Sequence, residues 1–143
     1  MKGRFTKLIV TAIRWIMLIS GILTATMVYA AIDPEGSMRS TFGEALPAGA
    51  PALVIRNWGA LIALVGAMLI YGAFNVAVRP LVLVVAGVSK AVFIGLVLSE
   101  GTRYLGTAGI PVAVDSLMIV LFAWYLAVAP RTAAPSARAA ATV

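Results

Sequence analysis

The chain has 143 residues, of which 62% are hydrophobic and only 11% charged, and its formal net charge is +6. A soluble domain carries about 25% charged residues, so this composition indicates a single membrane-embedded domain without a separate soluble module. The absence of Cys and His excludes disulfides, thiolate-held metals, histidine-ligated haem and catalytic triads that use His as the base.

The first predicted element is an apolar segment over residues 8–32, long enough to cross a bilayer as a helix. A cleaved signal peptide is the alternative, because the segment follows a basic start and Val28-Tyr29-Ala30 resembles a cleavage site. The length of the segment and the presence of Arg14 favour a spanning helix. Asp33 precedes a proline and ends this helix, and the polar residues 33–50 predict a solvated loop.

Three further spanning helices are predicted over residues 52–75, 80–100 and 111–129, each with a proline at or near its start. We therefore predict an all-α fold, an integral membrane bundle of four transmembrane helices within residues 1–129. Residues 130–143 are rich in Ala, Pro and Ser and predict a disordered cytoplasmic tail. In the second helix, Gly59, Ala63 and Ala67 form a stripe of small residues that predicts close packing against another helix.

The distribution of basic residues predicts the orientation in the membrane. With both termini in the cytoplasm, three basic residues (Arg39, Arg56 and Arg103) lie outside, and seven lie inside: Lys2, Arg4, Lys7, Arg14, Arg79, Arg131 and Arg138. The excess inside favours the cytoplasmic (inner) membrane with cytoplasmic N- and C-termini. Because the basic residues are scattered among apolar segments, we expect the lipid bilayer as the partner and no nucleic acid.

Lys90 is the central charge of the predicted bundle, since it lies near the middle of an almost unbroken apolar helix. A charge at that depth is costly and normally faces a partner or water. Asp115, in the next helix, lies roughly one turn closer to the outer end, within reach of a lysine side chain. We therefore predict an ion pair between Lys90 and Asp115, and a second, more hydrated pair between Arg56 and Glu100.

These charges suggest a polar pocket open to the outer side, with Lys90, Asp115, Arg56, Asn57 and Glu100 as its binding residues. Two interpretations remain open for the central pair. It can orient two helices, or it can bind a small ligand or relay protons. A lone lysine that reaches water is a third alternative.

Motifs for catalysis are missing: the sequence has no P-loop, no HExxH and no Gly-x-Ser-x-Gly. We name no catalytic, cofactor-binding or metal-binding residue, and we expect no cofactor. Retinal proteins need seven helices, and small multidrug transporters need a carboxylate in the first helix, which this chain lacks.

An apolar first helix is followed by an outer loop with prolines and by a Gly/Ala-rich second helix that opens with Arg56-Asn57-Trp58-Gly59. Two more spans follow, and this layout resembles the DoxX-like and DUF4345-like small four-helix membrane proteins. The resemblance covers roughly residues 8–128. It implies an association with quinone-linked oxidation, and it assigns no functional residue to this chain.

The function predicted first is a non-enzymatic accessory or structural membrane subunit, whose partner is another membrane protein or a second copy of the chain. The alternatives are a small-solute or proton-coupled transporter that uses Lys90 and Asp115, and a membrane partner of a quinone-linked oxidoreductase.

Overall fold

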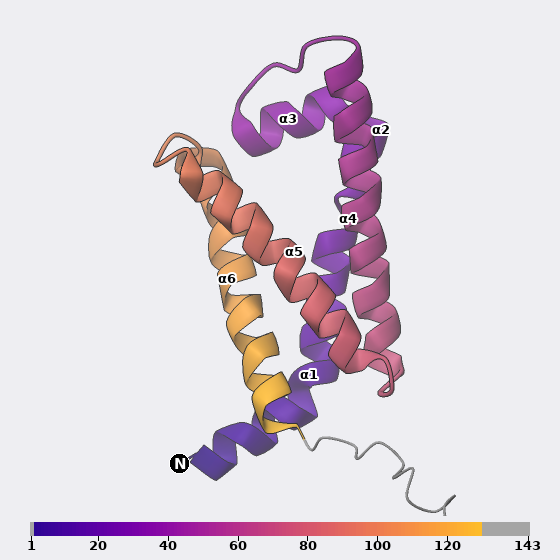
Figure 1. The fold of residues 1–143 in the computed structure, drawn as a ribbon, viewed down its shortest axis with the longest axis vertical. Coiled ribbons are helices and arrows are strands. Elements are labelled where there is room, and N and C mark those ends of the chain that lie inside the picture. Colours follow the sequence, from indigo (N-terminus) through magenta and orange to yellow (C-terminus); the bar gives the residue numbers. More distant parts are fainter. Residues whose placement is uncertain (1, 130–143) are drawn as a thin grey trace, which may run out of the picture.

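A computed structural model describes the backbone of residues 2–129 and the side chains of residue 8 and residues 10–129. The predicted disorder of residues 130–143 lies outside the described residues. The described chain is helical and contains six helices (Figure 1): α1 Lys2–Ala25, α2 Val28–Ile32, α3 Pro34–Phe42, α4 Ala50–Phe74, α5 Arg79–Ser99 and α6 Leu105–Val128.

Four helical segments are long and apolar enough to cross a membrane: Val10–Ile32, Ala50–Phe74, Arg79–Ser99 and Leu105–Val128. The first of them is interrupted at Thr26–Met27, where α1 ends and the short α2 continues toward Ile32. Large apolar side chains remain exposed on all four spans, as a lipid-facing surface requires. The predicted all-α bundle of four transmembrane helices is confirmed.

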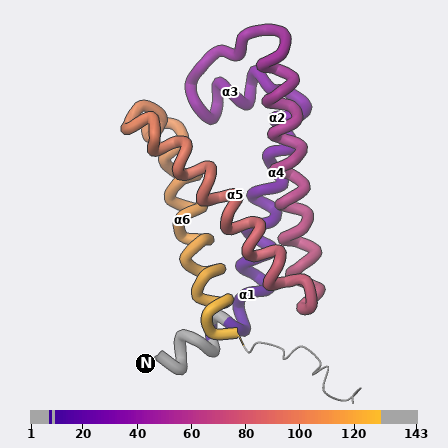
Figure 2. The backbone as a smooth tube through the Cα atoms, viewed as in Figure 1, coloured from indigo at the N-terminus to yellow at the C-terminus, as the bar shows by residue number. Residues whose placement is uncertain are grey.

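The helices form two pairs (Figure 2). In one pair α1 and α2 run along α4, and in the other α5 lies beside α6. The pairs meet at the end of the bundle opposite α3, around a core of apolar side chains. This core consists of Ile13, Met17, Leu69, Ala73, Val82, Leu83, Ala86, Phe122 and Tyr125.

Glycines allow the close approach of α1 and α2 to α4. A Cβ atom on Gly66 would lie 2.5 Å from the backbone nitrogen of Ala25, and one on Gly59 would lie 2.7 Å from the Cβ of Ala30. The predicted stripe is therefore right at Gly59. It is wrong at Ala67, which is exposed, because the contact face passes through Gly66, seven residues after Gly59.

The predicted loop over residues 33–50 is wrong over its first half, which forms α3. Asp33 caps this helix: its carboxylate accepts a hydrogen bond of 2.9 Å from the backbone N–H of Gly36 and one of 2.8 Å from the hydroxyl of Tyr29. These two bonds lower the pKa of Asp33 below its usual value of 3.8. The residues that end the first span thus also start a new helix, with Pro34 at its first position.

The fourth span begins at Leu105, six residues before its predicted start at residue 111. Pro111 lies inside α6 rather than in its first turn. A proline lacks an N–H and leaves the carbonyl four residues earlier without its helical partner, but membrane helices tolerate this interruption. The proline was therefore a misleading start signal.

Arg79, at the start of α5, is buried beside the end of α4. Its guanidinium donates hydrogen bonds to the carbonyls of Gly72, at 3.2 Å, and Ala73, at 3.0 Å. The final carbonyls of a helix have no partner within the helix, and a cation there also faces the negative end of the helix dipole. Arg79 thereby holds the tight turn between α4 and α5.

Candidate functional site: a cleft between the helix pairs

The two helix pairs diverge toward the end of the bundle that carries α3, and α3 lies across the space between them (Figure 1). A cleft of about 870 Å³ lies in this region. Every spanning segment contributes to its wall, together with α3 and the turn before α6. Among its lining residues are Val54, Trp58, Ile62, Phe93, Leu96, Ile110, Val114 and Met118.

The wall of the cleft is predominantly apolar, and the cleft is open to its surroundings. Val54 and Leu96 line it and yet are 63% and 65% exposed. Val54 lies four residues from the start of α4 and Leu96 three residues from the end of α5, so the cleft opens near the ends of these spanning helices. Its mostly apolar wall favours an apolar occupant.

One group of polar side chains lies at the deep end of the cleft, around Lys90. The ammonium of Lys90 forms an ion pair with Asp115 and donates a hydrogen bond of 3.2 Å to the hydroxyl of Thr24. The side chain of Lys90 is 9% exposed and that of Asp115 is 20% exposed. The three residues come from α5, α6 and α1, so this cluster links both helix pairs just beyond the apolar core.

Ser20 lies one helical turn before Thr24 on the same face of α1 and also lines the cleft. It is 1% exposed, and its hydroxyl has no hydrogen-bond partner among the described residues. A buried hydroxyl without a partner is uncommon in a native structure and needs an explanation.

The five residues predicted for the pocket divide into two groups. Lys90, Asp115 and Glu100 line the cleft, and the predicted contact between Lys90 and Asp115 is present. Arg56 and Asn57 are exposed and do not line it.

The predicted pair between Arg56 and Glu100 is wrong. Arg56 donates a hydrogen bond of 3.3 Å to the carbonyl of Ala31, in the neighbouring α2. Glu100 follows the last residue of α5, in the other helix pair, and forms no ion pair with any described residue. The divergence of the pairs separates these two side chains, although both lie toward the α3 end of their helices.

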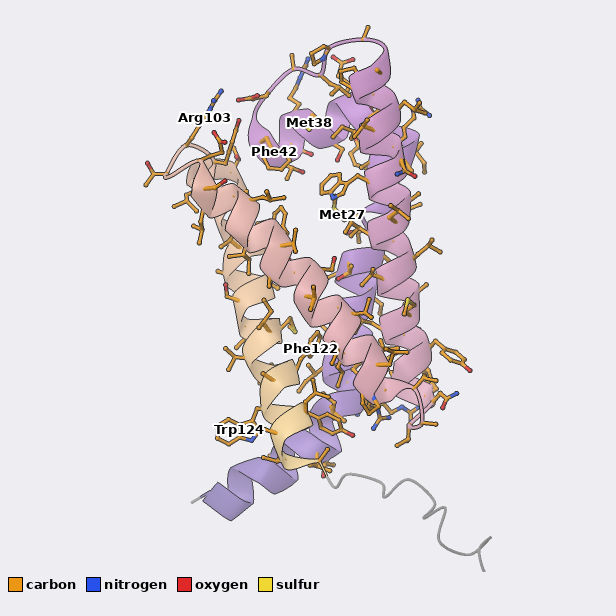
Figure 3. All side chains as sticks on the ribbon, viewed as in Figure 1. Met27, Met38, Phe42, Arg103, Phe122 and Trp124 are labelled. Atoms are coloured by element: carbon orange, nitrogen blue, oxygen red, sulfur yellow. The ribbon has the colours of Figure 1, made fainter. Side chains whose placement is uncertain are left out.

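A second polar cluster joins the two sides of the cleft at its mouth. Glu44, in the loop after α3, accepts hydrogen bonds from Arg103, at 2.6 Å, and from the hydroxyl of Tyr104, at 3.0 Å. The bond to Glu44 and partial burial raise the pKa of Tyr104. Phe42 packs edge-on against the Tyr104 ring with 5.4 Å between centroids, and Figure 3 shows Phe42 and Arg103 at the facing ends of the two sides.

Sequence reasoning missed Ser20, Thr24 and the cluster around Glu44. The first two could have been found, because a Ser and a Thr four residues apart share one face of an apolar helix. The cluster at the mouth carries no such signal, since Glu44 and Arg103 are 59 residues apart.

Within residues 2–129, no three His, Cys, Asp or Glu side chains lie close enough together to hold a metal ion. The chemistry that this cleft offers consists of an apolar wall, the ion pair of Lys90 and Asp115, hydroxyl groups, and the carboxylate of Glu100. The chain is a multi-pass membrane protein whose four spans surround such a cleft. Comparison with known protein families, curated proteins and solved structures finds no match to this chain.

Proposed function

We propose that this chain is a non-enzymatic membrane protein that binds a small lipid-soluble molecule in the cleft. The observation that carries the proposal is the cleft itself, about 870 Å³ with a mostly apolar wall and a polar cluster at its deep end. Ligand sites in proteins commonly occupy about 300–1,000 Å³ and combine apolar walls with a few convergent polar groups.

The position of the core favours binding over passage across the membrane. Ile13, Met17, Leu69 and Phe122 are fully buried where the helix pairs meet, and they close the bundle beyond Lys90. A proton-coupled transporter, the second candidate, is favoured by the ionisable pair at the end of the cleft. A transporter requires a further state in which this core opens. Proton uptake into sealed vesicles, driven by an added solute, tests the transporter function.

We further propose that the protein resides in the cytoplasmic membrane, with both termini in the cytoplasm and α3 outside. The seven basic residues on one side against three on the other support this orientation. A partner membrane protein, including a quinone-linked oxidoreductase, stays a prediction from the sequence, and co-purification of the full chain tests it.

Trp58 provides a direct test of binding, because it lines the cleft whereas Trp15 and Trp124 do not. A variant with Trp15→Phe and Trp124→Phe keeps Trp58 as its sole tryptophan. Bromine atoms quench tryptophan fluorescence only at close range. Dibrominated stearyl alcohol added to the variant in nanodiscs should quench it saturably. A variant that keeps only Trp124, which is exposed on α6, reports simple partition into the lipid.

A blocking substitution completes the test. Val114→Phe adds a ring to the wall of the cleft and should weaken saturable quenching at least about tenfold, whereas Val120→Phe on the exposed face of α6 should leave it unchanged. Equal melting temperatures of the two variants exclude a folding defect. Quenching of Trp58 that rises linearly, like that of Trp124, would overturn the proposal.

A further inference from the structure

The unpartnered hydroxyl of Ser20 gives information about the ligand itself, and the inference drawn from it rests on the proposed binding function. Ser20 is 1% exposed and lines the cleft. Its hydroxyl finds no partner among the described residues, and its oxygen is buried at the edge of the cleft. Burial of such a group without a partner costs free energy, which a ligand atom that accepts the bond would recover.

Lys90 offers a second donor in the same region. An ammonium carries three N–H bonds, and Lys90 directs two of them, to Asp115 and to Thr24. No other described residue accepts a hydrogen bond from it. The cleft therefore presents donors at its deep end, and the complement of a donor is an acceptor oxygen.

The charges around these donors select an uncharged acceptor. Asp115 already compensates Lys90, so a carboxylate or phosphate would place a second negative charge beside Asp115. An amine would place a second positive charge beside Lys90. Lys90 also lies nine residues before Ser99, the last residue of α5, which is about 14 Å along the helix. At that depth a charged headgroup would lose its hydration without gaining a counter-ion.

We propose that the ligand is a lipid-soluble molecule with one uncharged acceptor group, such as an alcohol, ketone or ester, and that Ser20 is the residue that selects it. The apolar body of the ligand lies along the wall that includes Trp58, Phe93 and Met118. The acceptor oxygen lies at the deep end, within reach of the hydroxyl of Ser20 and the ammonium of Lys90.

The test compares headgroups on an identical chain in the nanodisc assay with Trp58 as the sole tryptophan. Four dibrominated stearyl compounds serve as probes: the alcohol, the methyl ester, the ionised acid and the protonated amine. The alcohol and the ester should half-saturate the quenching of Trp58 at a concentration at least about tenfold lower than the acid or the amine. Stronger binding of the acid or the amine would overturn the charge argument.

Ser20→Ala isolates the contribution of the hydroxyl. It should weaken binding of the alcohol and the ester about fivefold, the effect of one lost neutral hydrogen bond, and Ser20→Thr should retain binding. Because the hydroxyl has no partner among the described residues, Ser20→Ala should not lower the melting temperature of the free protein. If the hydroxyl had a structural role, Ser20→Ala would lower the melting temperature.

The remaining outcomes separate this inference from the function on which it rests. Saturable quenching that is equal for all four headgroups would keep the binding function and overturn the selection of an uncharged acceptor. A headgroup preference that is unaffected by Ser20→Ala would overturn the assignment to Ser20. Quenching of Trp58 no greater than that of the Trp124 control, with every probe, would overturn both proposals.

Discussion

At the level of single residues, the ammonium of Lys90 links the two helix pairs of the bundle. It contacts side chains from two other helices, Asp115 of α6 and Thr24 of α1, at a depth where water is scarce. A buried charge is tolerated only where its partner and its hydrogen bonds offset the loss of hydration. The cluster therefore couples the two helix pairs at the point where they begin to separate.

This coupling leads to a prediction about stability. Lys90→Met and Asp115→Leu should each lower the free energy of unfolding by about 3–5 kcal/mol, because each leaves an uncompensated buried charge. The double variant should recover most of the loss, since an apolar pair can replace a buried ion pair. Denaturation in detergent measures all three variants.

The exposed pair of Arg39 and Glu35 on α3 is the matched control, with an N–O distance of 3.2 Å. Arg39→Met should cost less than about 1 kcal/mol, as is usual for surface pairs. Strictly additive losses in the Lys90→Met, Asp115→Leu double variant would contradict the contact between these two side chains. If the pair also belongs to the binding site, the double variant should be stable and yet bind the alcohol poorly.

At the scale of elements, the most restrictive contact is that of α1 and α2 with α4. Gly21, Gly59 and Gly66 bring the backbones so close that an added methyl group has no room. Without a hydrophobic driving force between helices in lipid, such close packing is a main source of helix association. The pairing of the first two spans therefore rests on glycine rather than on bulky side chains.

Gly66→Ala tests this packing directly. Its Cβ would lie 2.5 Å from the backbone nitrogen of Ala25, so the helices must move apart, and we expect a loss of about 1–3 kcal/mol in the free energy of unfolding. Gly87→Ala on α5 is the control, because nothing lies within 4 Å of the added atom. It should be neutral or slightly stabilising, since Ala favours helices. Equal thermal stability of both variants would contradict the close contact.

At the scale of the whole molecule, the even number of spans places both ends of the described chain on one side of the membrane. Figure 1 shows that the start of α1 and the end of α6 lie at the end of the bundle opposite α3. The contact between Glu44 and Arg103 likewise places the loop after α3 and the turn before α6 at a shared end.

Single cysteines test this topology, because the chain contains no natural cysteine. Glu35→Cys on α3 and Thr102→Cys before α6 should react with a membrane-impermeant thiol reagent in intact cells. Ala77→Cys, in the turn between α4 and α5, should react only after the membrane is permeabilised. All three positions are exposed, so accessibility within the protein does not bias the comparison. Labelling of Ala77→Cys from outside would reverse the proposed orientation.

The four membrane spans and the contact between Lys90 and Asp115 could be predicted from the sequence. Hydropathy and span length depend only on local composition, and a charge at mid-membrane depth leaves few partners to choose from. The start of α6 was predicted wrongly because Pro111, a common helix start, lies inside this helix. The helix α3 was missed because Asp33 was interpreted only as the end of the first span, whereas it also caps α3.

The shape of the site could not be predicted from the sequence, because it depends on how the helix pairs are arranged. The divergence of the helix pairs opened the cleft, separated Arg56 from Glu100 and brought Glu44 to Arg103. It also left the buried hydroxyl of Ser20 without a hydrogen-bond partner in the part of the chain that the structure describes, which residue type and spacing cannot reveal. Packing angles between membrane helices depend on where backbones can approach closely, and that is a property of pairs of surfaces rather than of any single segment.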